Sequence, residues 1–160
     1  MKTNHGKVPM DKDLSKLKRD LRKLLRSQLL AVLATQNQGQ PYASLVAFAS
    51  SDDLKSLYFA TTRSTRKYAN LSGDSLVAML VDNRSNKTSD FRLAMAATAT
   101  GTAEEVDPRE RERALDRYLE KHPHLSDFVH SPTCAFCKIR VRTFFVVTRF
   151  QSVVEVHVRP

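Results

Sequence analysis

The sequence has 160 residues, of which 41% are hydrophobic, so it is long enough for one well-buried domain and short for two. Its two cysteines are too few for a disulfide-dense secreted scaffold, and no run of about 18 apolar residues could span a bilayer. The first residues lack the apolar core of a cleavable leader, so we expect a soluble cytoplasmic protein. The net charge of +9 is compatible with nucleic acid, an acidic membrane or an anionic ligand as a partner.

Most of this positive charge lies in the first 30 residues, which hold nine Lys or Arg and three Asp. Residues 1–10 are predicted to form a loose tail. From Asp11 to Arg26, leucines recur at helical spacing with cations on the remaining faces, which predicts an amphipathic helix. Such a helix could lie on a membrane or on nucleic acid, but no aromatic residues are interleaved with the cations to stack on bases. We therefore expect a docked helix with a solvated basic face.

The rest of the chain is rich in strand-like segments. We expect strands at 29–35, 41–49, 57–60, 75–81, 91–106, 134–142 and 143–150, with 152–158 as an edge. Residues 36–40 are turn material, so the first two strands should form a hairpin. Gly101 indicates a bulge or the close approach of another backbone. Asp107 and Pro108 begin a helix that Pro123 ends. Short turns between strands, with helices at the ends, favour an antiparallel barrel over a parallel sheet.

One segment between a strand and a helix has the composition of an anion site. Ser64 is a plausible N-cap for a short helix that Gly73 ends as the first residue past its C-terminus. Four hydroxyls, three cations and the free N–H groups of the helix start lie within one turn, a combination that favours a phosphate oxyanion. The residues are Thr61, Thr62, Arg63, Ser64, Thr65, Arg66 and Lys67. A capped surface helix with solvated cations fits the segment alone equally well.

The order of several motifs resembles that of the FMN-binding split-barrel family, which is related to pyridoxamine 5′-phosphate oxidase. The motifs are LAVLAT, GQPYASLVAF, LYFAT, STRKYANL, SLVAMLV, GTAEEV and FFVVTRF, and they extend from about Leu29 to Phe150. The resemblance implies a mainly β fold, a six-stranded antiparallel split barrel with peripheral helices. We expect a single domain over residues 11–160, with the amphipathic helix at its N-terminus. The resemblance also implies a homodimer with two FMN molecules at its interface.

The resemblance further implies which residues bind the cofactor. Arg66 and Lys67 match the pair that holds the FMN phosphate, and Thr61 and Thr62 match donors beside it. This agrees with the anion site derived from composition.

Two further stretches match cofactor contacts of the family. Ser44, Leu45 and Val46 match a strand that runs along the flavin ring and its ribityl chain, although plain barrel core is an equal interpretation. In the loop 83–89, which reaches the flavin of the second subunit in the family, Asn83 and Arg84 are the expected contacts.

Two other groups of residues are weaker candidates. Cys134 and Cys137 form a C-x-x-C with three histidines upstream, but the segment reads as a strand in which residues three apart point to opposite faces. We therefore predict no metal site. The adjacent Glu104 and Glu105 should also point to opposite faces, which makes a paired acid and base improbable there.

Three functions are compatible with the sequence. The leading hypothesis is an FMN-binding flavoprotein that acts as an oxidoreductase on an unidentified small substrate. The alternatives are a non-catalytic protein that binds or senses flavin or haem, and a basic protein that binds nucleic acid through residues 11–26. The catalytic residues are not identifiable from the sequence.

Efficient oxidation of pyridoxamine 5′-phosphate is not expected. The true oxidases of the family carry an Arg and a His two residues apart near the C-terminus, which reach the substrate over the flavin. Here the corresponding segment is FQSVVEVHVRP, in which Glu155 lies two residues before His157 and no Arg has that role. We expect His157 to be an edge-strand residue.

Overall fold

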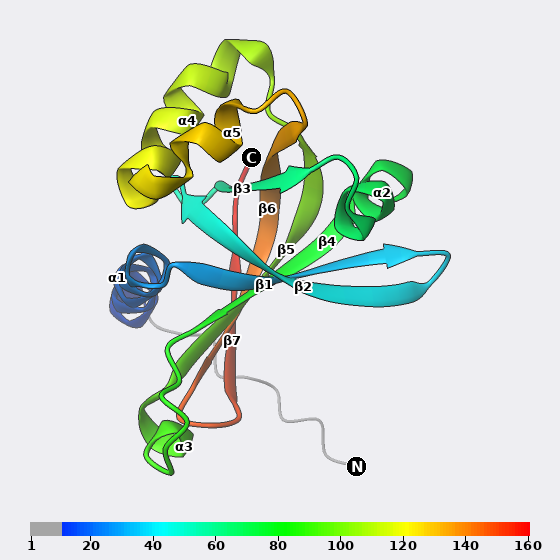
Figure 1. The fold of residues 1–160 in the computed structure, drawn as a ribbon. Helices are drawn as coiled ribbons and strands as arrows, with labels where there is room; N and C mark the ends of the chain where they lie inside the picture. Colours follow the sequence, from blue (N-terminus) through cyan, green and yellow to red (C-terminus); the bar gives the residue numbers. More distant parts are fainter. Residues whose placement is uncertain (1–10) are drawn as a thin grey trace.

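The computed structural model describes residues 11–160, and within them seven strands form one antiparallel sheet (Figure 1). The predicted tail, residues 1–10, lies outside the described residues. The strand order is β3-β2-β1-β4-β5-β6-β7, and β3 also pairs with β6, so β1 to β6 close into a barrel that β7 extends. This confirms the predicted six-stranded antiparallel barrel. The strands are β1 (Leu30–Asn37), β2 (Gln40–Ser50), β3 (Ser56–Thr62), β4 (Leu76–Asp82), β5 (Met95–Glu105), β6 (Cys134–Thr148) and β7 (Ser152–His157).

The helices lie around the barrel. They are α1 (Asp11–Ser27), α2 (Arg66–Gly73), α3 (Asp90–Leu93), α4 (Pro108–Lys121), the 3-10 turn η1 (Pro123–Leu125) and α5 (Ser126–His130). As predicted, Asp107 caps α4 by accepting a hydrogen bond from the N–H of Arg109 at 2.8 Å. None of the described helices is long and apolar enough to cross a membrane.

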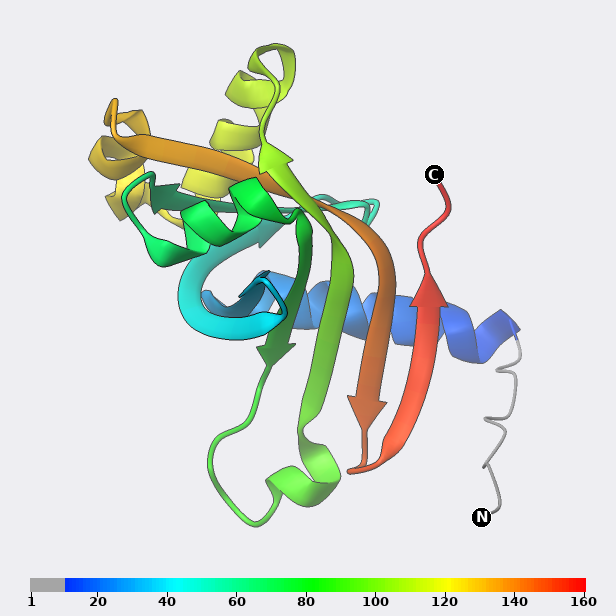
Figure 2. The same cartoon turned by 90° about the vertical axis from the view of Figure 1, so that its right-hand side faces the viewer.

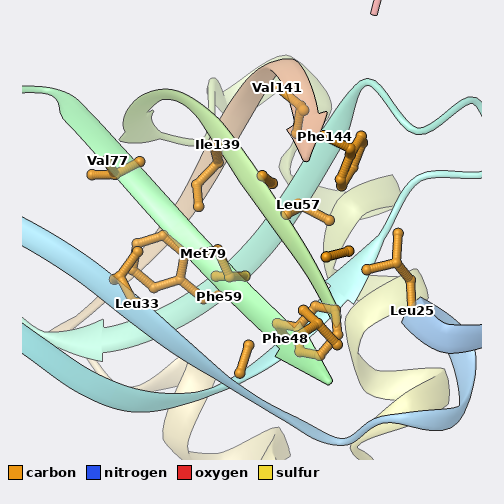
Figure 3. Packing of buried hydrophobic residues seen from close by; sticks show 14 of the residues in the cluster. Leu25, Leu33, Phe48, Leu57, Phe59, Val77, Met79, Ile139, Val141 and Phe144 are labelled. Carbon is orange, nitrogen blue, oxygen red and sulfur yellow. The ribbon is translucent and has the colours of Figure 1, made fainter. Parts of the chain in front are cut away.

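Alternating residues of the strands fill the barrel interior. Figure 3 shows Leu33 of β1, Phe48 of β2 and Met79 of β4 in this core, together with Leu25 of α1. The leucines of α1 therefore have the partner surface that an amphipathic helix requires. A second, smaller cluster lies under α4, where the rings of Tyr118 and Phe136 meet edge to face at 5.3 Å.

The two strands predicted at 134–142 and 143–150 are one strand, β6, of 15 residues. Thr100 of β5 pairs with Thr143, whereas Gly101 pairs with Val141, so Arg142 is an extra residue in β6. This β-bulge bends the strand without ending it, and the segment contains no Gly or Pro to start a turn. A Cβ on Gly101 would lie 2.0 Å from the carbonyl oxygen of Arg140, which confirms the predicted close approach of another backbone. The bulge lies opposite this glycine, in β6.

Two other boundaries differ from those predicted. The strand predicted over 91–106 begins only at Met95, because α3 occupies the residues before it. Asp90 accepts hydrogen bonds from the backbone N–H groups of Ser85 and Lys87, which folds the preceding loop back on itself. The short helix α5 was not predicted. Its buried Val129 packs in the cluster under α4, so tertiary contacts form it.

Candidate functional site

The loop between β3 and α2 positions the start of the helix. Thr65 is the N-cap, not the predicted Ser64: the hydroxyl of Thr65 accepts a hydrogen bond from the N–H of Tyr68 at 3.3 Å. The same hydroxyl donates to the carbonyl of Thr62 at 2.9 Å and lies 2.8 Å from that of Thr61, whereas Ser64 is exposed. Gly73 is the last residue of α2 and not the first one past it.

As a result, Arg66 and Lys67 are the first two residues of α2. Among the described residues, no acceptor binds their backbone N–H groups, which therefore remain available at the positive end of the helix dipole. Thr62 is partly exposed beside them, but Thr61 is only 3% exposed and its hydroxyl is used by Thr65. Three of the four predicted phosphate-binding residues thus lie together at the surface, and Thr61 supports them from within.

The third cation of the segment, Arg63, points elsewhere. Its guanidinium donates to a carboxylate oxygen of Glu105 at 2.7 Å and to the carbonyls of Pro132 and Cys134. Tyr68 of α2 donates to the other oxygen of Glu105 at 2.6 Å. Burial acts to raise the pKa of Glu105, but the hydrogen bonds from Tyr68 and Arg63 outweigh it and hold this pKa below its ordinary value. Glu105 thus fixes α2 to the end of β5.

On its other side, α2 packs against the β1–β2 hairpin (Figure 1). The side-chain amide of Asn70 donates to the hydroxyl of Thr35 at 3.0 Å, and both residues are buried. The guanidinium of Arg66 lies over the ring of Tyr42, 5.6 Å from its centroid. β2 pairs with β3 only over its last residues, Phe48 to Ser50, so the edge of β2 from residue 40 to 46 has no strand partner among the described residues.

The predicted residues of β2 alternate between the two faces of the sheet. Ser44 lies on the face of Tyr42, and its hydroxyl is buried without any hydrogen-bond partner in the described structure. Val46, on the same face, is 5% exposed and belongs to the barrel core, so a ligand could reach only its backbone. Leu45 is 67% exposed on the opposite face. Sequence reasoning missed Tyr42, although period-two spacing from Ser44 would have indicated it.

Asn83 and Arg84 lie at the other end of the barrel. The side-chain oxygen of Asn83 accepts a hydrogen bond from the N–H of Met95 at 2.7 Å, and Arg84 forms an ion pair with Asp82 at 3.2 Å. The whole of β4, about 23 Å at 3.3 Å per residue, separates them from the end of α2. Figure 2 shows α2 and the loop that leads to α3 at opposite ends of β4. The fold therefore does not bring them to Arg66 within one chain.

The outer face of the sheet is apolar beside this site. Leu45 pairs with Val32 and Val32 with Leu80, so the three side chains lie side by side on the side away from the core. Leu30 and Leu76 on the same face are also about half exposed. Contiguous apolar surface of this kind is characteristic of protein interfaces.

The other candidate residues take part in contacts that stabilise the fold. Cys134 and Cys137 are buried free thiols on opposite faces of β6, and burial raises the pKa of Cys137 to about 12, so it is not a reactive thiolate at neutral pH. Glu104 points away from Glu105 and binds Arg140 at 2.6 Å. His157 lies on the edge strand β7, as predicted, 3.1 Å from the hydroxyl of Thr143.

Comparison with known proteins identifies the family of the chain. Residues 17–147 match the family model described as pyridoxamine 5′-phosphate oxidase. The chain belongs to the pyridoxamine 5′-phosphate oxidase family. No curated protein matches the sequence.

Solved structures share the fold of this family member at low sequence identity. A haem-binding protein from Mycobacterium smegmatis superposes with a TM-score of 0.77 at 16% identity, covering 88% of this chain and 57% of that one. An FAD-binding protein from Mesorhizobium loti superposes with a TM-score of 0.63 at 19% identity, covering 80% of this chain and 91% of that one. A putative pyridoxamine 5′-phosphate oxidase from Listeria innocua superposes with a TM-score of 0.63 at 17% identity, covering 82% of this chain and 98% of that one. At these identities the likeness shows the fold alone.

Proposed function

We propose that this protein binds FMN between the start of α2 and the free edge of β2, and that it acts as an oxidoreductase on a small substrate. The observation that carries the proposal is the set of unsatisfied groups at this place. The N–H groups of Arg66 and Lys67 and the buried hydroxyl of Ser44 all lack partners among the described residues. A phosphate at the helix start and a polar, planar ring along β2 would satisfy them.

The parts of the site suit the parts of the cofactor. Arg66 and Lys67 supply two cations beside a helix N-terminus, which is the arrangement that binds a phosphate monoester. The unpaired edge of β2 offers backbone donors and acceptors to a heterocycle, and Ser44 adds a hydroxyl. The flavin supplies hydride or electron transfer when bound, and these residues hold and orient it.

We further propose that the site is completed in a homodimer. Leu45 is exposed on the outer face directly beside Ser44, so a second copy packed on that face would cover the edge of the site. In such a dimer the partner's loop 83–89 can approach the flavin, whereas the same loop of one chain lies at the far end of β4. Membership of the family and the apolar outer face support this assembly.

Haem is the second candidate ligand, because a structural neighbour is described as a haem-binding protein. FMN and haem can be distinguished by the absorption spectrum and the mass of any chromophore that copurifies with the protein. Flavin gives bands near the blue end of the visible range and the mass of FMN, whereas haem gives a Soret band and its own mass.

Titration with FMN and riboflavin tests the phosphate site. The Arg66→Ala, Lys67→Ala variant should bind FMN about 10² to 10⁴ times more weakly, because each charge-assisted contact contributes about 1.5 to 3 kcal/mol. Its affinity for riboflavin, which has no phosphate, should change little. The matched control is Arg19→Ala, Lys23→Ala, which removes two cations from the exposed face of α1. Equal FMN affinity in the parent and the α2 variant would refute this site.

A further inference from the structure

A cleft of the described residues lies away from the proposed flavin site. It has a volume of about 960 Å³ and lies between the β2–β3 loop, α4, the middle of β6 and residues 158–160. Eight Lys or Arg but only three Asp or Glu line it. It borders Ser56 and Tyr58 near the start of β3, whereas α2 begins beyond the other end of that strand, about 20 Å away at 3.3 Å per residue.

The acidic residues of this cleft already have partners. Asp52 binds Arg117 at 2.9 Å and Arg26 at 3.1 Å, and hydrogen bonds from these two guanidinium groups lower the pKa of Asp52 to about 2. Glu110 binds the ammonium group of Lys138, which is 5% exposed. Asp52 and Glu110 thus pair with three cations, Arg117, Arg26 and Lys138, and are not available to the others.

Four arginines in the cleft have no ion pair or side-chain hydrogen bond among the described residues: Arg109, Arg113, Arg142 and Arg159. The first two lie one turn apart on α4. Arg142, the bulged residue of β6, lines the cleft from the sheet. Like charges that converge from separate elements repel one another, and a bound polyanion removes that repulsion.

The cleft also contains a flat aromatic surface. The ring of Tyr58 lines it and stacks on Phe136 with an angle of 14° between the planes and 6.0 Å between centroids. Such a ring is held in place and can support a planar heterocycle. The volume is within the range of small-molecule sites.

We propose that this cleft binds a small, multiply phosphorylated anion, with Arg109, Arg113 and Arg142 binding its phosphates. The Tyr58 ring favours a nucleoside triphosphate over inorganic polyphosphate. The proposal does not depend on flavin binding, because no residue of the α2–β2 site lines the cleft.

Calorimetric titration of the purified protein with ATP, and separately with inorganic tripolyphosphate, at 150 mM salt tests this inference. We expect one equivalent of ATP to bind the parent, and the Arg109→Ser, Arg113→Ser variant to bind it about 100 times more weakly. Both arginines are exposed helix residues without side-chain partners in the described chain, so the fold should tolerate the change. The matched control, Arg19→Ser, Lys23→Ser, loses the same charge from α1 and should bind like the parent.

A third variant separates this cleft from the flavin site. The Arg66→Ala, Lys67→Ala protein should bind ATP normally, and loss of binding there instead would overturn the proposal. The proposal would also be overturned if the parent did not bind ATP, or if the cleft and α1 variants lost ATP affinity equally. Binding of duplex DNA without binding of ATP would overturn it as well. If the parent binds ATP more tightly than tripolyphosphate and Tyr58→Leu removes this preference, the site is assigned to nucleotides. If the parent binds the two equally, the site is assigned to inorganic polyphosphate.

Discussion

The hydroxyl of Ser44 can be used to test whether β2 binds a ligand or is only part of the barrel core. A buried hydroxyl without a partner costs about 1 to 3 kcal/mol, so it is unfavourable in the ligand-free protein. We therefore predict that Ser44→Ala raises the melting temperature of the flavin-free protein by roughly 2 to 4 °C per kcal/mol gained. The same variant should bind FMN about tenfold more weakly, since the ligand loses a hydrogen bond.

Thermal unfolding and FMN titration of the same preparations measure these two opposite effects. Ser72→Ala on α2 is the control, because Ser72 is exposed and its hydroxyl donates to the carbonyl of Tyr68. If Ser44→Ala lowered the stability of the flavin-free protein and left FMN affinity unchanged, the hydroxyl would belong to the core and not to a ligand site.

At the scale of elements, Glu105 fixes α2 to the end of β5. It lies at the end of β5 and accepts hydrogen bonds from Arg63 before α2 and from Tyr68 within it. We predict that Glu105→Gln weakens FMN binding about fivefold without touching the cofactor, equivalent to about 1 kcal/mol, because α2 is less firmly placed. The neighbouring Glu104→Gln is the control: Glu104 binds Arg140 on the other face and should leave FMN affinity unchanged.

The pKa of Glu105 adds a pH dependence to this prediction. Its pKa in the folded state lies below the ordinary value of 4.5, which applies to the unfolded state. At a pH between these two pKa values, the unfolded state therefore binds more protons than the folded state. The stabilisation is complete above about pH 4.5 and is lost as the pH falls through the folded pKa. Glu105→Gln should remove this part of the acid sensitivity in unfolding measurements at pH 3 to 6. An unchanged pH profile would contradict the role of the carboxylate.

At the scale of the whole molecule, the apolar outer face predicts association. Leu45 is exposed among Val32, Leu80 and other aliphatic side chains, so Leu45→Glu places a charge in the proposed interface. We predict that the parent has twice the mass of the 18.1 kDa chain in sedimentation experiments and that the variant shifts towards the monomer and releases flavin on dilution.

His124→Glu is the control for the dimer prediction, since His124 is exposed on η1, away from the outer face. It should remain dimeric and keep its flavin. A parent protein that is monomeric at micromolar concentration and still holds FMN tightly would rule out an interface site.

Features that depend on local spacing could be predicted from the sequence. Alternating apolar residues predicted the strands of the barrel, leucines at helical spacing predicted α1, and Asp107 with Pro108 predicted the start of α4. Arg66 and Lys67 could be found in the same way, because hydroxyls, cations and a helix start adjoin one another in the chain.

Features that depend on residues far apart in the chain could not be predicted in this way. Arg63 resembles its neighbours in sequence, yet Glu105, 42 residues later, binds it and removes it from the anion site. β6 remains one strand because β5 pairs with it on both sides of the bulge at Arg142. The basic cleft joins arginines of α4 and β6 with the β2–β3 loop and the C-terminal residues. No local pattern encodes such neighbours, because strand pairing and helix packing, not sequence spacing, set the distances between them.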